Sequence, residues 1–154
     1  MASRHHTKDK GDIGLTKAIA DLTEKRYGVC LPISEHMPFD MIALDAKMRT
    51  ARVQSKYAKA NKGSILLRLL STWADGNGVH HKRVNLDLVD GYSIYCPETG
   101  KVYYVPRSVL EDHASTFSLR VQPTKDGSRR READDFLDPQ VLFAPEPDGR
   151  EAVF

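Results

Sequence analysis

The sequence predicts an α/β protein in which a mixed β-sheet is flanked by helices. Apolar residues recur at helical spacing near the N-terminus, at Leu15, Ala18, Ile19 and Leu22. This spacing indicates an amphipathic helix over residues 11–27. Short apolar runs of strand length follow it, separated by polar or glycine-rich turns. A helix, then strands, then a further helix is typical of a sheet covered by helices.

The remaining elements follow from local composition, in chain order. Strands are expected at residues 29–33, 39–44, 51–57, 64–70, 92–95, 101–105 and 117–122, and a short helix at residues 107–114. Residues 97–100, with the sequence Pro-Glu-Thr-Gly, predict a hairpin between two of these strands. Residues 75–78, with the sequence Asp-Gly-Asn-Gly, predict a turn.

Composition divides the chain into three parts. Residues 1–10 are polar and basic, and we expect a flexible arm. Residues 11–122 contain the predicted elements and are long enough for one domain with a substantial core. Residues 123–154 are rich in Pro, Asp and Arg and form a C-terminal extension, whose candidate role is self-association.

The overall composition is that of an ordinary soluble protein, with 40% hydrophobic and 29% charged residues. No apolar run is long enough to cross a membrane, and no secretory signal precedes the first helix. We therefore expect a cytoplasmic protein with no membrane partner. The two cysteines, Cys30 and Cys96, form no CxxC pair and are expected to be free, buried thiols.

Charge is distributed unevenly along the chain, although the net charge is only +2. Residues 1–83 carry fifteen Lys and Arg against eight Asp and Glu, whereas residues 84–154 carry eight against thirteen. A basic first half suits a polyanionic substrate, and solvated surface charge is the competing interpretation.

Three polar residues on two neighbouring strands form the candidate site. Asp40 lies at the start of one predicted strand, and Gln54 and Lys56 lie two residues apart on the next. Residues two apart point to the same face of a strand, so an antiparallel pair would bring the three side chains together. An acid, a second oxygen ligand and a lysine can hold a hard cation beside a phosphate. A plain salt bridge between Asp40 and Lys56 is the alternative.

This layout resembles the PD-(D/E)xK nuclease superfamily, and in particular its intron-associated branch. The matching segments are residues 10–14 (KGDIG), 34–40 (SEHMPFD), 53–57 (VQSKY), 71–75 (STWAD), 95–97 (YCP) and 103–105 (YYV). They cover roughly residues 8–107 and are similar to cyanobacterial group I intron homing endonucleases. The resemblance implies a restriction-endonuclease-like core and Mg²⁺ as cofactor. It also implies assembly as a homodimer or homotetramer.

The resemblance also implies roles for the site residues. Asp40 and Gln54, helped by the Ser55 backbone carbonyl, would hold the metal, and Lys56 would orient the attacking water. The sequence departs from the usual pattern in two ways. Pro38 stands two residues before Asp40 rather than directly before it, and Gln54 replaces the second acid.

A further acid often comes from the first helix in this superfamily. Related sequences with a Gly-Glu pair would place it at Leu15, which here fits the apolar stripe. Asp12, one turn earlier, and Glu35, on the loop before Asp40, are the two candidates to replace it. Helix capping is a competing role for Asp12.

DNA contacts are expected from two basic segments of the first half. The candidate residues are Lys59, Lys62, His80, His81, Lys82 and Arg83. Arg68 shares a strand face with Leu66 and Leu70, so we expect it to be paired inside the protein. Trp73 is expected to be a core or framework residue rather than a platform for base stacking.

The sequence thus predicts a Mg²⁺-dependent endonuclease that cuts double-stranded DNA, of the intron-encoded homing type. Two alternatives stay open. One is a structure-specific nuclease of the Holliday-junction resolvase kind, which would cut four-way junctions with little sequence preference. The other is a DNA-binding module whose nuclease site has decayed. This alternative is considered because Gln54 and Leu15 each stand where the family pattern might place an acid.

Overall fold

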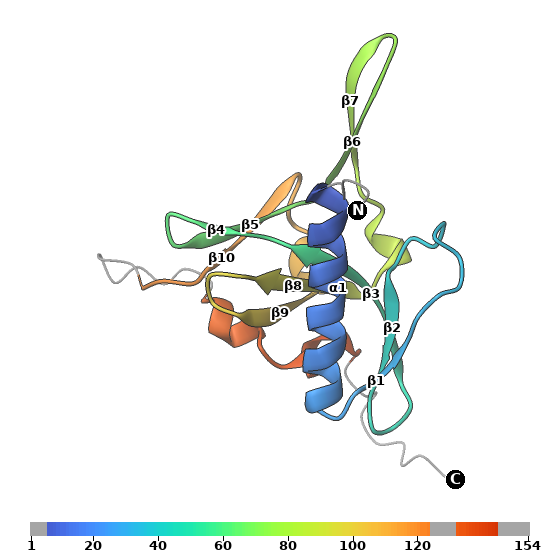
Figure 1. Cartoon of the computed structure of the whole chain (residues 1–154), viewed down its shortest axis with the longest axis vertical. Helices are drawn as coiled ribbons and strands as arrows, with labels where there is room; N and C mark the ends of the chain where they lie inside the picture. The colour runs from blue at the N-terminus through green and yellow to red at the C-terminus, as the bar shows by residue number, and fades with distance from the viewer. Residues whose placement is uncertain (1–5, 124–131, 145–154) are drawn as a thin grey trace, which may run out of the picture.

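The computed structural model describes residues 6–123 and 132–144, and its centre is a five-stranded mixed sheet (Figure 1). The strand order is β1-β2-β3-β8-β9. The strands are β1 Gly28–Cys30, β2 Met41–Leu44, β3 Thr50–Tyr57, β8 Gly91–Cys96 and β9 Lys101–Pro106. Neighbouring strands are antiparallel except for β3 and β8, which are parallel. The predicted α/β class with a mixed sheet is therefore confirmed.

Helix α1, His6–Glu24, covers one face of this sheet (Figure 1). Ala18 and Leu22 are fully buried in a core that includes Met41 and Val53. The helix starts five residues before the expected position 11, so residues 6–10 are not a flexible arm. No Gly or Pro interrupts these residues, and a helix tolerates exposed polar side chains beyond the sheet. Residues 1–5 lie outside the described part of the chain.

A second, three-stranded sheet lies against the opposite face. Its order is β10-β5-β4, formed by β10 Thr116–Arg120, β5 Ser64–Arg68 and β4 Ala60–Asn61. Ile65 and Leu67 of β5 are buried, and so is Leu69, the residue that directly follows the strand. Leu66 and Arg68 are consequently on the exposed face of β5, which corrects the expectation that Arg68 is paired inside the protein.

Strands β6, Leu70–Asp75, and β7, Gly78–Arg83, form a hairpin that projects from the rest of the molecule at the top of Figure 1. The sequence predicted the turn but not its two strands. Trp73 lies on this hairpin with 47% of its surface exposed, so the expectation of a core position was wrong. Strand β6, with the sequence Leu-Ser-Thr-Trp-Ala-Asp, shows no strict apolar alternation, and the hairpin pairs with no other strand of the described chain. The local pattern therefore gives no sign of which side chains are buried.

Two further expectations from the sequence need correction. Helix α2, Arg107–Leu110, is shorter than the predicted residues 107–114. Cys96 is buried as expected, but Cys30, at the end of the edge strand β1, is exposed. Among the described helices, none is long and apolar enough to cross a membrane.

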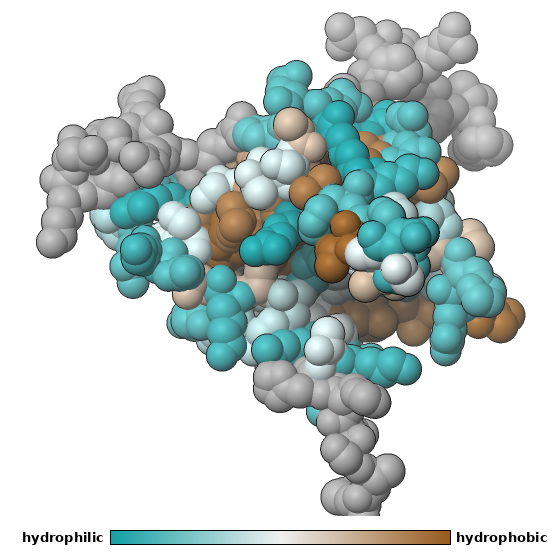
Figure 2. All heavy atoms as spheres, turned by 90° about the horizontal axis from the view of Figure 1, so that it is seen from above, coloured by the Kyte–Doolittle hydropathy of each residue, from teal (hydrophilic) through white to brown (hydrophobic). Residues whose placement is uncertain are grey.

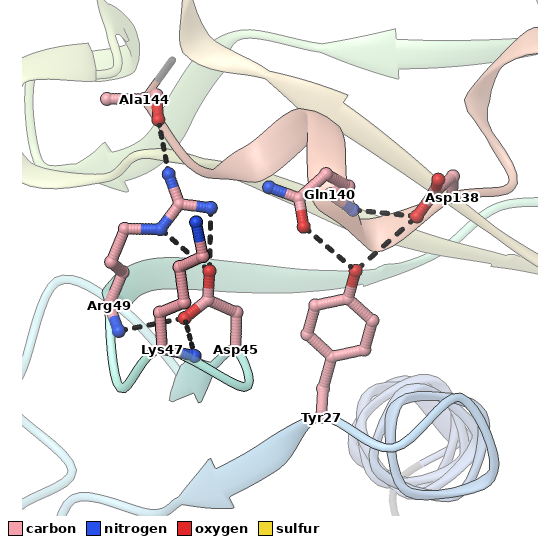
Figure 3. Close-up of polar contacts among 7 residues, drawn as sticks. All are labelled: Tyr27, Asp45, Lys47, Arg49, Asp138, Gln140 and Ala144. Carbon is pink, nitrogen blue, oxygen red and sulfur yellow. Dashed lines mark hydrogen bonds and ion pairs between the residues drawn. The ribbon is translucent and has the colours of Figure 1, made fainter. Parts of the chain in front are cut away.

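The described part of the C-terminal extension packs on the core through two 3₁₀ turns, η2 Ala133–Phe136 and η3 Pro139–Leu142. Leu142 and Phe143 are buried, and Leu142 lies so close to Gly91 that a Cβ at Gly91 would stand 2.4 Å from it. Figure 3 shows polar contacts that hold this segment against Tyr27 and the β2–β3 turn. Residues 132–144 therefore belong to the fold, while residues 124–131 and 145–154 lie outside the described chain.

Candidate active site

The pairing of β2 with β3 brings Asp40 to Gln54. Met41 is paired with Val53 in the antiparallel register, and the Asp40 amide donates to the Val53 carbonyl at 3.0 Å. Continuing the register by one residue places Asp40 opposite Gln54. The sequence expectation for these two positions depended on an antiparallel pair, which the structure contains.

The Asp40 carboxylate is held in place by the chain of the neighbouring strand. Its Oδ2 accepts a hydrogen bond of 2.7 Å from the Ser55 amide. Asp40 precedes β2, so its side chain occupies a position where a continuing strand would have offered a backbone carbonyl. Among the described residues, no other hydrogen bond or ion pair involves this carboxylate, which leaves Oδ1 available to a ligand.

Gln54 and Lys56 lie on the same face of the sheet as Asp40. Their partners on the parallel strand β8 are Tyr92 and Ile94. Lys56 is half-buried and forms no ion pair with Asp40, which argues against the simple salt bridge. The lysine therefore shares a face of the sheet with the carboxylate without forming an ion pair with it.

Tyr92 is a neighbour of the site that sequence reasoning missed. Only 2% of its surface is exposed, and it lies beside Gln54 across the β3–β8 register. Burial, together with the charge of the Asp40 carboxylate, raises the pKa of the Tyr92 hydroxyl above its ordinary value. The parallel pairing of two strands separated by 33 residues of chain leaves no local signal that could have revealed this neighbour.

A cavity of about 280 Å³ opens beside Asp40 and distinguishes the positions of the two spare acids, although neither Gln54 nor Lys56 lines it. Leu15 of α1 and Glu35 of the loop before β2 line it together with Asp40. Asp12 instead lines a separate cavity with Asp9 and Thr16. The structure thus brings Glu35, but not Asp12, to the same cavity as Asp40. Asp12 lies inside α1, six residues after its start, so it does not cap the helix either.

The oxygen donors around Asp40 fit a hard divalent cation. The Asp40 carboxylate, the Gln54 amide oxygen and the Ser55 carbonyl are the hard ligands that Mg²⁺ prefers. Within residues 6–123 and 132–144, no group of three or more His, Cys, Asp or Glu side chains is gathered closely enough to bind a metal. The site is consequently poor in negative charge, and a cation here would depend on neutral oxygens as well as on Asp40.

The comparison with known families agrees with this geometry. The family model for PD-(D/E)XK endonucleases matches residues 5–138. The chain belongs to the PD-(D/E)XK endonuclease family. It is therefore a nuclease, and nucleases of this family generally use divalent metal ions.

A solved structure supports the same fold for this endonuclease. The structure of the bacterial homing endonuclease I-Ssp6803I matches it with a TM-score of 0.69 and 19% sequence identity, over 86% of this chain and 88% of that one. No curated protein sequence matches the chain.

The residues expected to contact DNA are placed on two separate parts of the endonuclease. Lys59 and Lys62 are exposed at the β4 end of the second sheet. His80, His81 and Lys82 lie on the projecting hairpin formed by β6 and β7.

Arg83 differs from the other basic residues of this hairpin. Its guanidinium donates to the backbone carbonyls of Glu111 and His113, at 3.0 and 2.8 Å. Both bonds use Nη2 and anchor Arg83 at the base of the hairpin, while Nε and Nη1 remain as donors. The expected DNA contact of Arg83 therefore stays a prediction.

Proposed function

We propose that this protein is a Mg²⁺-dependent, site-specific homing endonuclease that hydrolyses double-stranded DNA, is encoded within a group I intron and acts in the cytoplasm. The observation that carries the proposal is the arrangement of Asp40, Gln54 and Lys56 on one face of β2 and β3, with the carboxylate fixed by the Ser55 amide. The likeness in fold to I-Ssp6803I supports the homing type.

The proposal gives each site residue a role. Asp40 and Gln54, with the Ser55 carbonyl, would hold the cation at the edge of the sheet. A bound Mg²⁺ supplies positive charge that polarises the scissile phosphate and acidifies water. Lys56, which is not neutralised by Asp40, would orient the attacking water and stabilise the charge that develops on the phosphate.

Self-association as a homodimer or homotetramer is part of the proposal. One chain has one such arrangement in its described part, and each arrangement can attack one strand. Cutting both strands of a duplex therefore calls for two copies, one at each strand. A symmetric pair of copies would present the two sites in a fixed relation to the duplex.

The proposal is tested with the full-length protein and two site variants, Asp40→Asn and Lys56→Ala. Each should slow Mg²⁺-dependent cleavage by about 10³-fold, the loss expected when a group that stabilises transition-state charge is removed. DNA affinity should change by less than about threefold, because neither side chain is a main phosphate contact. Lys8→Ala, an exposed lysine on α1, is the matched control and should cleave like the wild type.

The same assay separates the alternatives. Cleavage of both variants at near the wild-type rate would refute the assigned site. Preferential cutting of four-way junctions over linear duplex would indicate a structure-specific resolvase. Tight duplex binding without cleavage at any divalent metal concentration would indicate a decayed site. The apolar Leu15 in the Asp40 cavity is the reason for considering this alternative.

A further inference from the structure

The β6–β7 ribbon, residues 70–83, is exposed on both of its faces. Its two strands pair only with each other, over six register pairs from Leu70–Arg83 to Asp75–Gly78. Every residue from Ser71 to Val79 is exposed. An isolated two-stranded ribbon is only marginally stable in water, so binding to another surface would stabilise a ribbon of this kind.

The base of the β6–β7 ribbon is fixed to the body of the molecule. Leu69, which directly precedes it, is fully buried, and the Leu69 amide donates to the Ser115 carbonyl at 2.8 Å. The Val84 amide donates back to the Leu69 carbonyl at 2.9 Å, and Arg83 binds the loop after α2. These contacts fix the orientation of the β6–β7 ribbon at its base, while its far end is exposed to solvent.

The register sorts the side chains of the β6–β7 ribbon onto two unequal faces. Trp73 lies opposite His80, and their rings stack with centroids 5.4 Å apart and 22° between planes. The His80 Nε2 lies 2.9 Å from the Asp75 Oδ1, which fixes the imidazole against the indole. Lys82 lies on this same face, two residues beyond His80. We call it the Trp73 face.

The opposite face of the β6–β7 ribbon offers fewer free polar groups. It carries Ala74 opposite Val79, and Thr72 opposite His81. The Thr72 Oγ1 and the His81 Nδ1 already share a hydrogen bond of 2.9 Å. Val79 is the exposed apolar residue here, and it lies on the other side of the strand pair from Trp73.

A second copy of the chain is a poor partner for this surface. Trp73 and Val79, the exposed large hydrophobic residues of the β6–β7 ribbon, point to opposite faces, so neither face has a continuous apolar patch. Viewed from above, the side from which the ribbon projects is mainly hydrophilic, with hydrophobic residues in separate groups (Figure 2). Stable protein interfaces have apolar centres, which this surface lacks.

We propose that the β6–β7 ribbon lies in the major groove of the substrate duplex, with the Trp73 face toward the base edges and Lys82 at a phosphate. The inference rests on the proposed endonuclease function and adds the surface that selects the DNA sequence. A two-stranded ribbon fits the major groove of B-DNA, which is about 12 Å wide. The indole N–H of Trp73, the imidazole of His80 and the Ser71 hydroxyl are then the groups that reach base edges.

The test uses full-length protein carrying Asp40→Asn, so that binding is measured without cleavage. This protein selects duplexes from a randomised library, and affinity is then measured for an enriched and a random duplex. Adding Trp73→Ala should lower the ratio of the two affinities by about tenfold or more, because base contacts carry the discrimination. Val79→Ala, on the opposite face, should leave that ratio unchanged.

A second variant separates phosphate contact from base contact. Lys82→Ala should weaken binding to both duplexes by a similar factor and reduce the slope of log affinity against log salt by about one. Circular dichroism should give the same spectrum for all variants, since the substituted side chains are exposed.

The outcomes separate this inference from the proposed function. Selective binding that survives Trp73→Ala unchanged overturns the role of the β6–β7 ribbon and leaves the endonuclease proposal standing. A change of molecular mass in light scattering for Trp73→Ala also overturns it, because the ribbon would then join copies of the chain. Failure of the Asp40→Asn protein to enrich any sequence rejects sequence readout altogether. A wild-type protein that cleaves no duplex with Mg²⁺ rejects the proposed function itself.

Discussion

Among the single residues of the site, Asp40 is the ligand that carries negative charge, and a divalent cation would need a second carboxylate beside it. The carboxylate is oriented by the Ser55 amide, but the neighbouring ligand Gln54 is neutral. Leu15 lines the Asp40 cavity, at the position where the sequence resemblance implies an acid. Glu35 is the other carboxylate of that cavity and is exposed on its loop. If the loop carried Glu35 toward Asp40, its carboxylate would supply the second negative charge that Leu15 of α1 does not provide.

Replacement of Glu35 tests this idea. In Glu35→Gln, we expect the Mg²⁺ concentration for half-maximal cleavage to rise about tenfold, because loss of a polar partner in the outer coordination shell typically costs 10- to 100-fold in metal affinity. Asp12→Asn is the matched control and should leave this concentration unchanged, since Asp12 lines a different cavity. The measurement is the cleavage rate against Mg²⁺ concentration. Equal curves for wild type and Glu35→Gln, or a shift for Asp12→Asn alone, would refute the assignment.

Asp40, Gln54 and Lys56 could be grouped from the sequence because strands alternate with a period of two and the turn between them is short. Arg68 and Trp73 could not be placed in the same way. Arg68 does share a strand face with Leu66, as predicted, but that face of β5 is the exposed one. Leucines occupy both faces of this strand, so the sequence does not reveal which face is buried. Trp73 was expected in the core because large aromatic residues are usually buried, and sequence alone does not reveal a strand pair without a covering layer.

At the scale of elements, the approach of α1 to β3 sets the position of the candidate lysine. A Cβ at Gly14 would lie 3.1 Å from the Lys56 carbonyl oxygen and 3.2 Å from the Tyr57 amide nitrogen. These are backbone atoms, so they cannot swing aside as a flexible side chain would. Gly14 therefore allows the helix to lie directly on the strand that carries Gln54 and Lys56.

A pair of glycine substitutions in the same helix isolates this contact. Gly11→Ala meets nothing within 4 Å and should stabilise the protein by about 0.5–1 kcal/mol through helix propensity. Gly14→Ala gains the same propensity but must displace α1 or β3, at a cost of about 1–3 kcal/mol. Because misplacement of a reacting group by about 1 Å can cost 10²-fold, we expect single-turnover cleavage to fall at least about tenfold in Gly14→Ala alone.

Chemical unfolding and single-turnover kinetics measure the two effects. If Gly14→Ala stabilised the protein as much as Gly11→Ala and cleaved at the same rate, the close approach would have no functional role.

The order of elements was largely predictable, whereas their long-range pairing was not. Local apolar alternation identified β2, β3, β8 and β9, and short turns implied that the first two and the last two pair with each other. The parallel contact of β3 with β8 joins segments separated by β4, β5 and the β6–β7 ribbon. No local pattern encodes that contact. The sequence therefore did not reveal that Tyr92 lies beside Gln54 in the candidate site.

At the scale of the whole molecule, the C-terminal segment closes the fold through the β2–β3 turn. Asp45 Oδ1 accepts the amides of Lys47 and Arg49, and its Oδ2 accepts Nε of Arg49 at 2.7 Å. The same guanidinium donates to the Ala144 carbonyl at 2.9 Å and lies over the Phe143 ring (Figure 3). Asp45 thus orients the arginine that holds the last described residues against the sheet.

The pKa of Asp45 makes this closure sensitive to acid. Burial alone would raise the pKa of the carboxyl, but the hydrogen bonds from Arg49 and Lys47 outweigh it and hold the pKa below its usual value. A carboxyl with a depressed folded pKa stabilises the protein above its unfolded pKa of about 3.9, and that stability is lost as the pH falls through the folded pKa.

Asp45→Asn should therefore reduce the free energy of unfolding by about 1–2 kcal/mol at pH 7, because it removes charge-assisted bonds from a buried group. The deficit should shrink as the pH falls from about 4 toward 2, where the wild-type carboxyl also loses its charge. Asp134→Asn, which breaks an exposed pair with Lys101, is the control and should cost less than about 1 kcal/mol. Urea unfolding at a series of pH values measures the free energy of unfolding of both variants. If the deficit of Asp45→Asn persisted undiminished to pH 2, the charge of this carboxylate would not stabilise the closure of the fold.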